Sequence, residues 1–361
     1  MILLLDHVGP PPASDARVCH ETVPSPSTLK GRARDRQARP KRSEAPVQNQ
    51  GESSTVITAL PLAGLALAVA MQSPLAALLI GIVVSIGRGS APAYAAPWGS
   101  RALQGAIVLL GFSLNAQDVL ALGQTTLLLT TTTVFAVLAT GFLSWTLLKP
   151  PRIQGALVSA GTAICGGTTI ATLAPVLKAK PEDTATCLAL VFLLNAVAVL
   201  TYPLIGAQLA LSDTQFGLWA ALSIHDTASV LAAAASFSPE ALETATVVKL
   251  GRTLWLIPLT LAASALTKRR GASPFPPFIL LFLGAVILRT LLPLGPMFLS
   301  TTALASKTLL LSALFLIGMQ IDRGALKTLS PRLWAHGVLL WLLASVGVLA
   351  ALLMMPGLGG A

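Results

Sequence analysis

Apolar segments fill most of this chain after residue 55, and they restrict it to a fold that lies in a membrane. Of all residues 54% are hydrophobic and only 11% are charged, against about 25% charged in an average soluble domain. A backbone that crosses a bilayer must satisfy its own hydrogen bonds, as a helix does. We therefore predict an all-α polytopic membrane protein with about 11 transmembrane helices. The apolar segments run near 56–71, 74–87, 101–117, 124–148, 153–177, 184–211, 216–237, 246–267, 276–292, 302–320 and 333–355.

Residues 1–55 form a separate region. They are rich in Pro, Ser, Arg and Gln, show no sustained apolar period, and contain eight Lys/Arg and six Asp/Glu. Such a composition buries too little apolar area to offset the entropy of ordering. We expect a disordered basic cytoplasmic tail, either solvated or bound to lipid headgroups, followed by a transporter domain over 56–361.

Basic residues in the short connections predict the orientation. With the tail inside, ten Lys/Arg fall on the cytoplasmic side, in the connections around 88–101, 149–152, 268–270 and 323–332. This asymmetry predicts a cytoplasmic N-terminus and an external C-terminus. The formal charge of +10 is then explained by anchoring beside anionic lipid rather than by nucleic-acid binding.

One apolar segment is interrupted by small polar residues. The stretch Ser159–Thr172 contains three glycines, four threonines and a cysteine. An unwound backbone at this depth requires protein, water or a solute as its partner, and the positive end of a following half-helix attracts an anion. Tight helix packing through small residues is the alternative. The candidate site residues here are Cys165, Gly166, Gly167, Thr168 and Thr169.

Ionisable residues inside apolar segments give a second set of candidates. His225 and Asp226 occur in Ser223–Ser229; a histidine can carry a coupled proton or, when protonated, bind an anion. Lys249 and Arg252 share a helical face and can together neutralise a divalent anion. The alternatives are an interfacial loop end for the first pair and snorkelling to headgroups for the second.

Asn195 and Lys307 complete the candidates. Asn195 lies mid-segment, where it can bond a ligand or another helix, and Lys307 lies among hydroxyl residues near the start of its segment. The sequence has no nucleotide phosphate loop, zinc-protease motif or paired metal-ligand spacing. We therefore expect no enzyme activity, no metal and no cofactor.

A short internal echo accompanies these candidates. Leu110-Gly-Phe-Ser-Leu-Asn115 is similar to Ile317-Gly-Met-Gln-Ile-Asp322, and each ends an apolar segment. In the eleven-segment count the two have opposite orientations, as inverted repeats require.

Three ordered motifs resemble one family of transporters. Gly161–Pro175, Ile224–Val230 and Val247–Pro258 are similar to signatures of the YeiH-type family, described as sulfate exporters. The resemblance covers about 56–355. It implies a bacterial inner-membrane carrier, similar in fold to bile-acid symporters and sodium/proton antiporters. That fold has inverted five-helix repeats with broken crossing helices.

The leading hypothesis is a secondary transporter of a small anion, sulfate or an organic sulfonate first, working by alternating access. Gly167-Thr168-Thr169 resembles the bile-acid symporter segment. A sodium- or proton-coupled symporter of another organic anion therefore stays open, as does a membrane sensor or scaffold that transports nothing.

Overall fold

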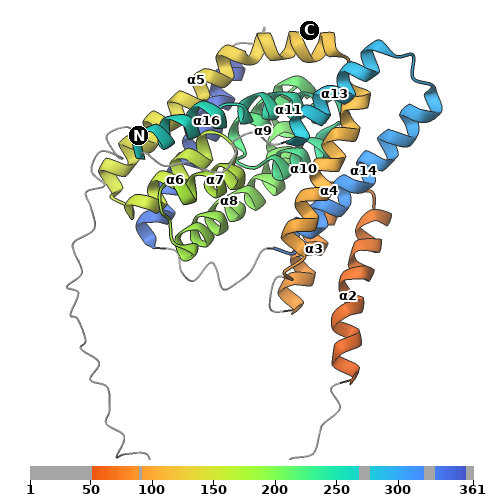
Figure 1. Ribbon diagram of the computed structural model, residues 1–361, viewed down its shortest axis with the longest axis horizontal. Coiled ribbons are helices and arrows are strands. Elements are labelled where there is room, and N and C mark those ends of the chain that lie inside the picture. The colour runs from red at the N-terminus through yellow and green to blue at the C-terminus, as the bar shows by residue number, and fades with distance from the viewer. Residues whose placement is uncertain (1–50, 89–91, 268–276, 321–329, 355–361) are drawn as a thin grey trace, which may run out of the picture.

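A computed structural model of the chain describes residues 51–354 apart from 89–91, 268–276 and 321–329, with side chains from residue 61. All regular structure in these residues is helical (Figure 1). The elements are α2 (Gly51–Ala70), α3 (Pro74–Arg88), α4 (Ala95–Leu110), η2 (Gly111–Ser113), α5 (Ala116–Leu148), α6 (Arg152–Ala163), α7 (Gly166–Val176), α8 (Pro181–Gln208), α9 (Asp213–Ser223), α10 (Thr227–Phe237), α11 (Pro239–Thr253), α12 (Leu256–Thr267), α13 (Pro277–Leu291), α14 (Pro296–Gly318) and α16 (Pro331–Met354).

Each predicted apolar segment coincides with one helix or with two consecutive short helices. Five stretches are long and apolar enough to cross a membrane: 116–148, 181–208, 239–267, 296–318 and 331–354. Several shorter apolar helices accompany them, including α3, α10 and α13. The predicted tail lies outside the described residues, except that 51–55 begin α2.

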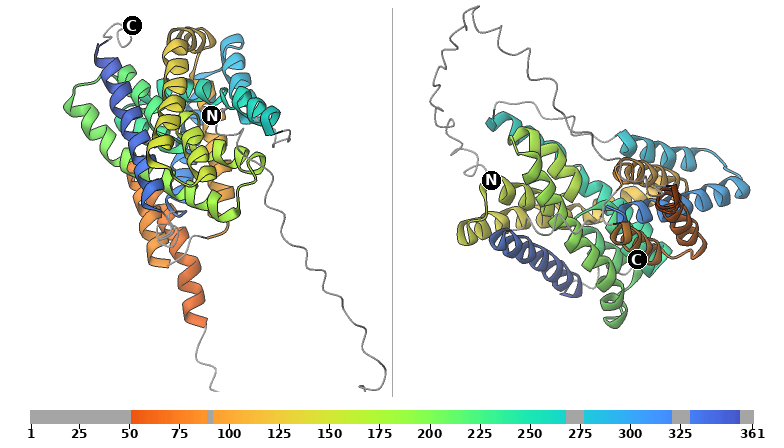
Figure 2. Two further views of the ribbon diagram at one scale, coloured as in Figure 1. Left: turned by 90° about the vertical axis from the view of Figure 1, so that its left-hand side faces the viewer. Right: turned by 90° about the horizontal axis from the view of Figure 1, so that it is seen from below.

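The helices form two packed groups. The flanking group consists of α2, α3, α4, α13 and α14, with α14 packed along α4 and α3. The central group consists of α5 to α12 and α16, with α9 packed against α11, α16 and α10. Helix α10 contacts α3 and α14, so it joins the groups. Figure 2 shows α2 projecting beyond the other helices at one end.

Glycines in the two echoed motifs lie where helix backbones meet. A methyl group on Gly318 of α14 would overlap a backbone oxygen of α3, and one on Gly81 of α3 would overlap the Phe315 oxygen of α14. A methyl group on Gly111 would lie 2.9 Å from the Phe282 oxygen of α13. Both motifs therefore end a helix at a close backbone approach of the kind that small residues allow.

Buried polar clusters attach α16 to the central group. The His336 ring lies between two hydroxyls, with Nδ1 2.9 Å from Ser144 Oγ of α5 and Nε2 3.0 Å from Ser159 Oγ of α6. A second cluster joins α16 to α8 and α9, where Ser345 bonds the Tyr202 hydroxyl and accepts from Trp219 Nε1 at 3.0 Å. These bonds satisfy polar groups in the interior and fix the position of α16.

Candidate functional site

The first helix interruption separates α6 from α7. Ile164 and Cys165 adopt non-helical dihedrals, with φ of −123° and −144°, and the chain resumes as a helix at Gly166. Thr169 stabilises the break, because its hydroxyl accepts from the Cys165 N–H at 3.1 Å. The interruption expected within Ser159–Thr172 therefore lies at Ile164 and Cys165.

The second interruption separates α9 from α10 at residues 224–226. Asp226 caps α10: Oδ1 accepts from the Ser229 N–H at 3.1 Å, and Oδ2 accepts from the Ser229 hydroxyl at 2.6 Å. Asn195 of α8 braces the unwound residues, since its amide donates to Asp226 Oδ2 at 2.5 Å and accepts from the His225 N–H at 3.1 Å. The His225 ring is fully buried, and neither ring nitrogen has a hydrogen-bond partner among the described residues.

The two buried cations of α11 bind the carboxyl ends of α6 and α9. Arg252 Nε donates to Ala163 O at 2.9 Å and Nη2 donates to Thr162 O, both at the end of α6. Its Nη1 donates to the oxygens of Ala221 and Leu222, at 3.1 and 2.7 Å, near the end of α9. Arg252 thereby joins the two interrupted helices.

Lys249 acts on the second break alone. Its Nζ donates to the oxygens of Ile224 and His225 at 2.7 and 2.8 Å, and to Ala221 O at 3.4 Å. Both cations are fully buried, and cations are stabilising at the negative ends of helices. We expected these side chains to neutralise an anion directly, whereas the structure points their donors at backbone carbonyls.

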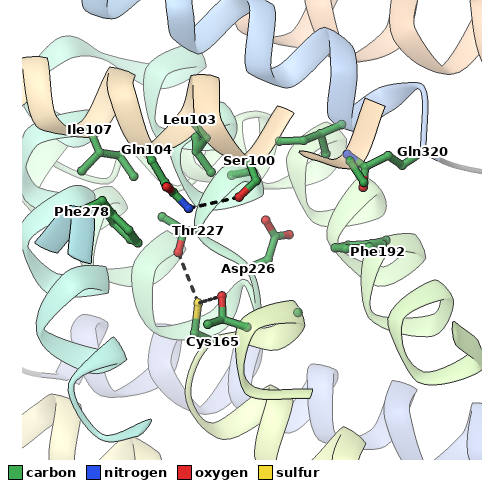
Figure 3. Close-up of a pocket in the computed structure, with 15 residues that line it drawn as sticks. Ser100, Leu103, Gln104, Ile107, Cys165, Phe192, Asp226, Thr227, Phe278 and Gln320 are labelled. Atoms are coloured by element: carbon green, nitrogen blue, oxygen red, sulfur yellow. Dashed lines mark hydrogen bonds between the residues drawn. The ribbon is translucent and has the colours of Figure 1, made fainter. Parts of the chain in front are cut away.

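A pocket with polar and apolar walls lies on the opposite side of the breaks, at the amino ends of α7 and α10 (Figure 3). Its volume is about 170 Å³. From the breaks it is lined by Cys165, Gly167, Thr168, Asp226, Thr227 and Ala228. The flanking group closes it with Ser100 and Gln104 of α4, Phe278 of α13 and Gln320 after α14, and Phe192 of α8 also contributes.

Polar groups converge in this pocket from both helix groups. The Cys165 thiol lies 3.3 Å from the Thr227 hydroxyl, so the two breaks meet there. Gln104 donates to the Ser100 hydroxyl at 3.2 Å on the facing wall. The amino end of a helix presents unpaired N–H groups and a positive dipole end. Two such ends facing one cavity form a site suited to oxygen atoms that carry negative charge.

Most of the predicted site residues lie at these breaks, some in the lining of the pocket and others outside it. Cys165, Gly167, Thr168 and Asp226 line the pocket. Outside the lining, Thr169, Asn195, Lys249 and Arg252 bond the backbone of the breaks, and Gly166 and His225 are buried beside them. A methyl group on Gly166 would lie 3.0 Å from Val191 and 3.3 Å from the His225 backbone, so its lack of a side chain permits this contact. Lys307 lies apart, with an exposed side chain on α14.

Sequence reasoning missed the wall that the flanking group supplies. Gln104 was not selected, although it is an amide inside an apolar segment, which is a signal for a ligand or a helix contact. Gln320 belonged to the echoed motif but was read only as evidence of a repeat. Spacing along the sequence does not reveal that these residues face the breaks, because about sixty residues separate Gln104 from Cys165.

Comparison with known proteins places the chain in a family. Residues 54–336 match the family described as conserved hypothetical protein 698. The chain belongs to this family. A UPF0324 membrane protein of Porphyromonas gingivalis is 43% identical over 78% of this chain and 87% of its own length. UPF0324 membrane proteins of Geobacter sulfurreducens and Bacteroides thetaiotaomicron are 39% and 38% identical, covering 89% and 86% of their lengths.

Family membership supports a multi-pass membrane location, because the relatives are named as membrane proteins and the chain has several helices of spanning length. No solved structure matches this chain. The matched region includes both helix breaks and the two cations of α11. The pocket therefore lies within the part of the chain that defines the family.

Proposed function

We propose that this protein is a secondary transporter that moves a small anion across the bacterial inner membrane by alternating access. The observation that supports this function is the orientation of the positive and negative ends of the two interrupted helices. The amino ends of α7 and α10 face one pocket, while Lys249 and Arg252 cover the carboxyl ends of α6 and α9. Broken helices whose positive ends face a cavity are how carriers hold an anionic group at membrane depth.

The size and lining of the pocket restrict the solute. A cavity of about 150 Å³ accommodates benzene in another protein, so 170 Å³ suits a solute of about that size. Hydroxyls and amides in its lining, together with the helix amino ends, match an oxyanion, and the apolar side chains Leu103, Ile107 and Phe278 suit a small organic group. Sulfate or a small organic sulfonate leads, in agreement with the resemblance of the three motifs to the YeiH-type family.

We also propose a membrane topology and an internal repeat. Eleven membrane segments would give a cytoplasmic N-terminus and an external C-terminus. The echoed motifs at Gly111 and Gly318 would mark related halves of opposite orientation, and both glycines lie at close helix contacts. The carboxylate of Asp226 in the pocket favours coupling to a cation, so a proton- or sodium-coupled symporter of another organic anion is the second candidate.

Flux in proteoliposomes tests the transport proposal. The purified full chain should exchange or take up radiolabelled sulfate or methanesulfonate faster than protein-free vesicles, and unlabelled anion should compete. Imposed sodium and proton gradients distinguish a free exchanger from a coupled symporter. If none of a panel of sulfonates, carboxylates and inorganic anions moves or binds, the transport proposal fails and the sensor or scaffold hypothesis takes its place.

Cys165 offers a direct test of the pocket. In a Cys19→Ser, Cys187→Ala background it is the remaining cysteine of the three in the chain, and its side chain lines the cavity. A small methanethiosulfonate reagent should label it, and saturating sulfate or methanesulfonate should slow the labelling at least severalfold. Labelling at an unchanged rate with every anion would contradict anion binding in this pocket.

A further inference from the structure

The charges buried around the pocket do not cancel. Each helix end carries roughly half a unit of charge, so the amino ends of α7 and α10 balance the carboxyl ends of α6 and α9. Lys249 and Arg252 add two positive charges with no exposed surface, and Asp226 adds one negative charge. The region therefore has a net charge of about +1 while Asp226 is ionised.

Lys249 counts as an ammonium in this sum, because its Nζ donates to three backbone oxygens and a neutral amine has two N–H groups. Among the titratable groups near Asp226, His225 is its neighbour in the chain, the Cys165 thiol is the titratable group of the first break, and Lys249 and Arg252 come from α11. An imidazolium at His225 would place two N–H donors without an acceptor beside a buried ammonium, so His225 counts as neutral.

The other carboxylates on helices that pack on α10 lie near the amino ends of those helices and do not line the pocket: Glu182 and Asp183 on α8, Asp213 on α9, and Glu240 and Glu243 on α11. Helix α8 presents the amide of Asn195. Along α3 and α14 the only ionisable side chains are Arg88 and Lys307, and Lys307 is exposed. Among the described residues, Asp226 is thus the carboxylate at the break whose neighbouring backbone oxygens Lys249 and Arg252 bind.

Asp226 is also the only charged residue that lines the pocket in the described part of the chain. Figure 3 shows its carboxyl group directed into the space between the breaks and the α4 wall. An anion bound there lies beside this carboxylate. A monovalent anion neutralises the net positive charge with Asp226 ionised. A divalent anion leaves one negative charge in excess, unless Asp226 gains a proton.

On the basis of the proposed function, we infer that Asp226 takes up one proton when the pocket binds a divalent anion and remains ionised when it binds a monovalent one. The acid form keeps its position, because Oδ1 still accepts from the Ser229 N–H and the Ser229 hydroxyl can rotate to accept the new O–H. The carrier would then move a dianion together with a proton. Asp226, rather than the neighbouring His225, would be the coupling residue.

Two probes of matched chemistry test this on the wild-type chain. Sulfate is divalent and methanesulfonate monovalent, and both stay fully ionised from about pH 5 to pH 8. By linkage, sulfate should bind up to about tenfold more weakly per unit of rising pH, whereas methanesulfonate affinity should stay nearly level. Equal pH slopes for the two probes would overturn the inference. Failure of both to bind would overturn the proposed function itself.

Asp226→Asn should keep residue 226 uncharged at every pH. Sulfate affinity should then lose its pH dependence, and sulfate should be preferred over methanesulfonate throughout the range. His225→Gln is the matched variant, one residue away, and should keep the difference in slope. Loss of that difference in His225→Gln, with its retention in Asp226→Asn, would assign the proton to histidine and refute the inference.

Proton counting in proteoliposomes gives a readout that does not depend on either variant folding. With a pH-sensitive dye inside the vesicles, wild-type sulfate entry should bring in about one proton per anion, whereas methanesulfonate entry should bring in none. Sulfate flux without proton movement would refute the role of Asp226 and leave the transport proposal intact.

Discussion

Replacing Arg252 by lysine tests whether one guanidinium holds the two interrupted helices together. Arg252 donates to four backbone oxygens, two at the end of α6 and two near the end of α9. A lysine keeps the positive charge but has a single ammonium in place of the planar fork. It can satisfy carbonyls at one helix end but cannot span both. At least two buried oxygens therefore lose their donor.

The expected loss follows from the cost of those oxygens. A buried polar group left without a partner costs about 1–3 kcal/mol, so Arg252→Lys should lose about 4 kcal/mol. Total stabilities are commonly about 5–15 kcal/mol, so the variant should fold and be weakened. Arg252→Ala would also remove the charge and the other two bonds, so we expect little folded protein from it.

Thermal unfolding of the purified protein in detergent measures the effect. For a chain of this size we expect the midpoint of Arg252→Lys to fall by about 5–10 °C. Arg332→Lys is the control, because that arginine is exposed at the start of α16. If Arg252→Lys unfolded at the same temperature as the wild type and the control, the four contacts would make no net contribution to stability. The helix-joining role of Arg252 would then have to be abandoned.

Two further predictions concern the packing around the site. Gly81→Ala should lower stability by about 2 kcal/mol or more, because the added methyl overlaps the Phe315 oxygen. Gly87→Ala on the same helix is the control: its added methyl would meet no atom within 4 Å, so it should be neutral or slightly stabilising. Equal melting temperatures of the two variants would contradict close packing of α3 on α14. Asn195→Leu should lose about 2–4 kcal/mol and most anion binding, because it removes the donor to Asp226 and the acceptor of the His225 N–H. Wild-type binding by this variant, measured by anion-induced thermal stabilisation, would show that Asn195 does not hold the site.

Apolar length and glycine content were sufficient to predict the helices and the first break. The Gly-Gly-Thr-Thr cluster identified the interruption, and the structure shifts it to Cys165. His225 and Asp226 were expected to be functional because ionisable residues occur there inside an apolar segment, and the structure places the second interruption at them. In both cases the signal is local, since each break arises from the residues that occupy it.

A third interruption, between α11 and α12, was not predicted as a break. Residues 254–255 separate these helices, and Pro258 follows four residues after Leu254. A proline ring clashes with the carbonyl four residues earlier and lacks the N–H that would bond it. Pro203 lies within the unbroken α8, so proline alone does not determine where a membrane helix stops.

The pocket could not be predicted from any local pattern in the sequence. Its outer wall comes from α4 and from residues next to α14, and these reach the breaks only through packing between the two helix groups. The sequence also did not indicate which groups the Arg252 and Lys249 side chains bind. Their spacing indicated a shared helical face, which the structure has, but a shared face does not specify whether the donors meet a solute or a carbonyl.

Under the proposed transport function, the position of these cations has a consequence for release of the solute. An arginine bound directly to an oxyanion forms strong paired hydrogen bonds, and a carrier must let its solute leave as well as enter. Here Arg252 and Lys249 are bonded to the backbone, so their charge acts on the pocket through the helix ends and at a distance. An anion would break contacts with N–H groups, hydroxyls and amides when it leaves, and no ion pair. The site can therefore favour negative charge while binding loosely enough for turnover.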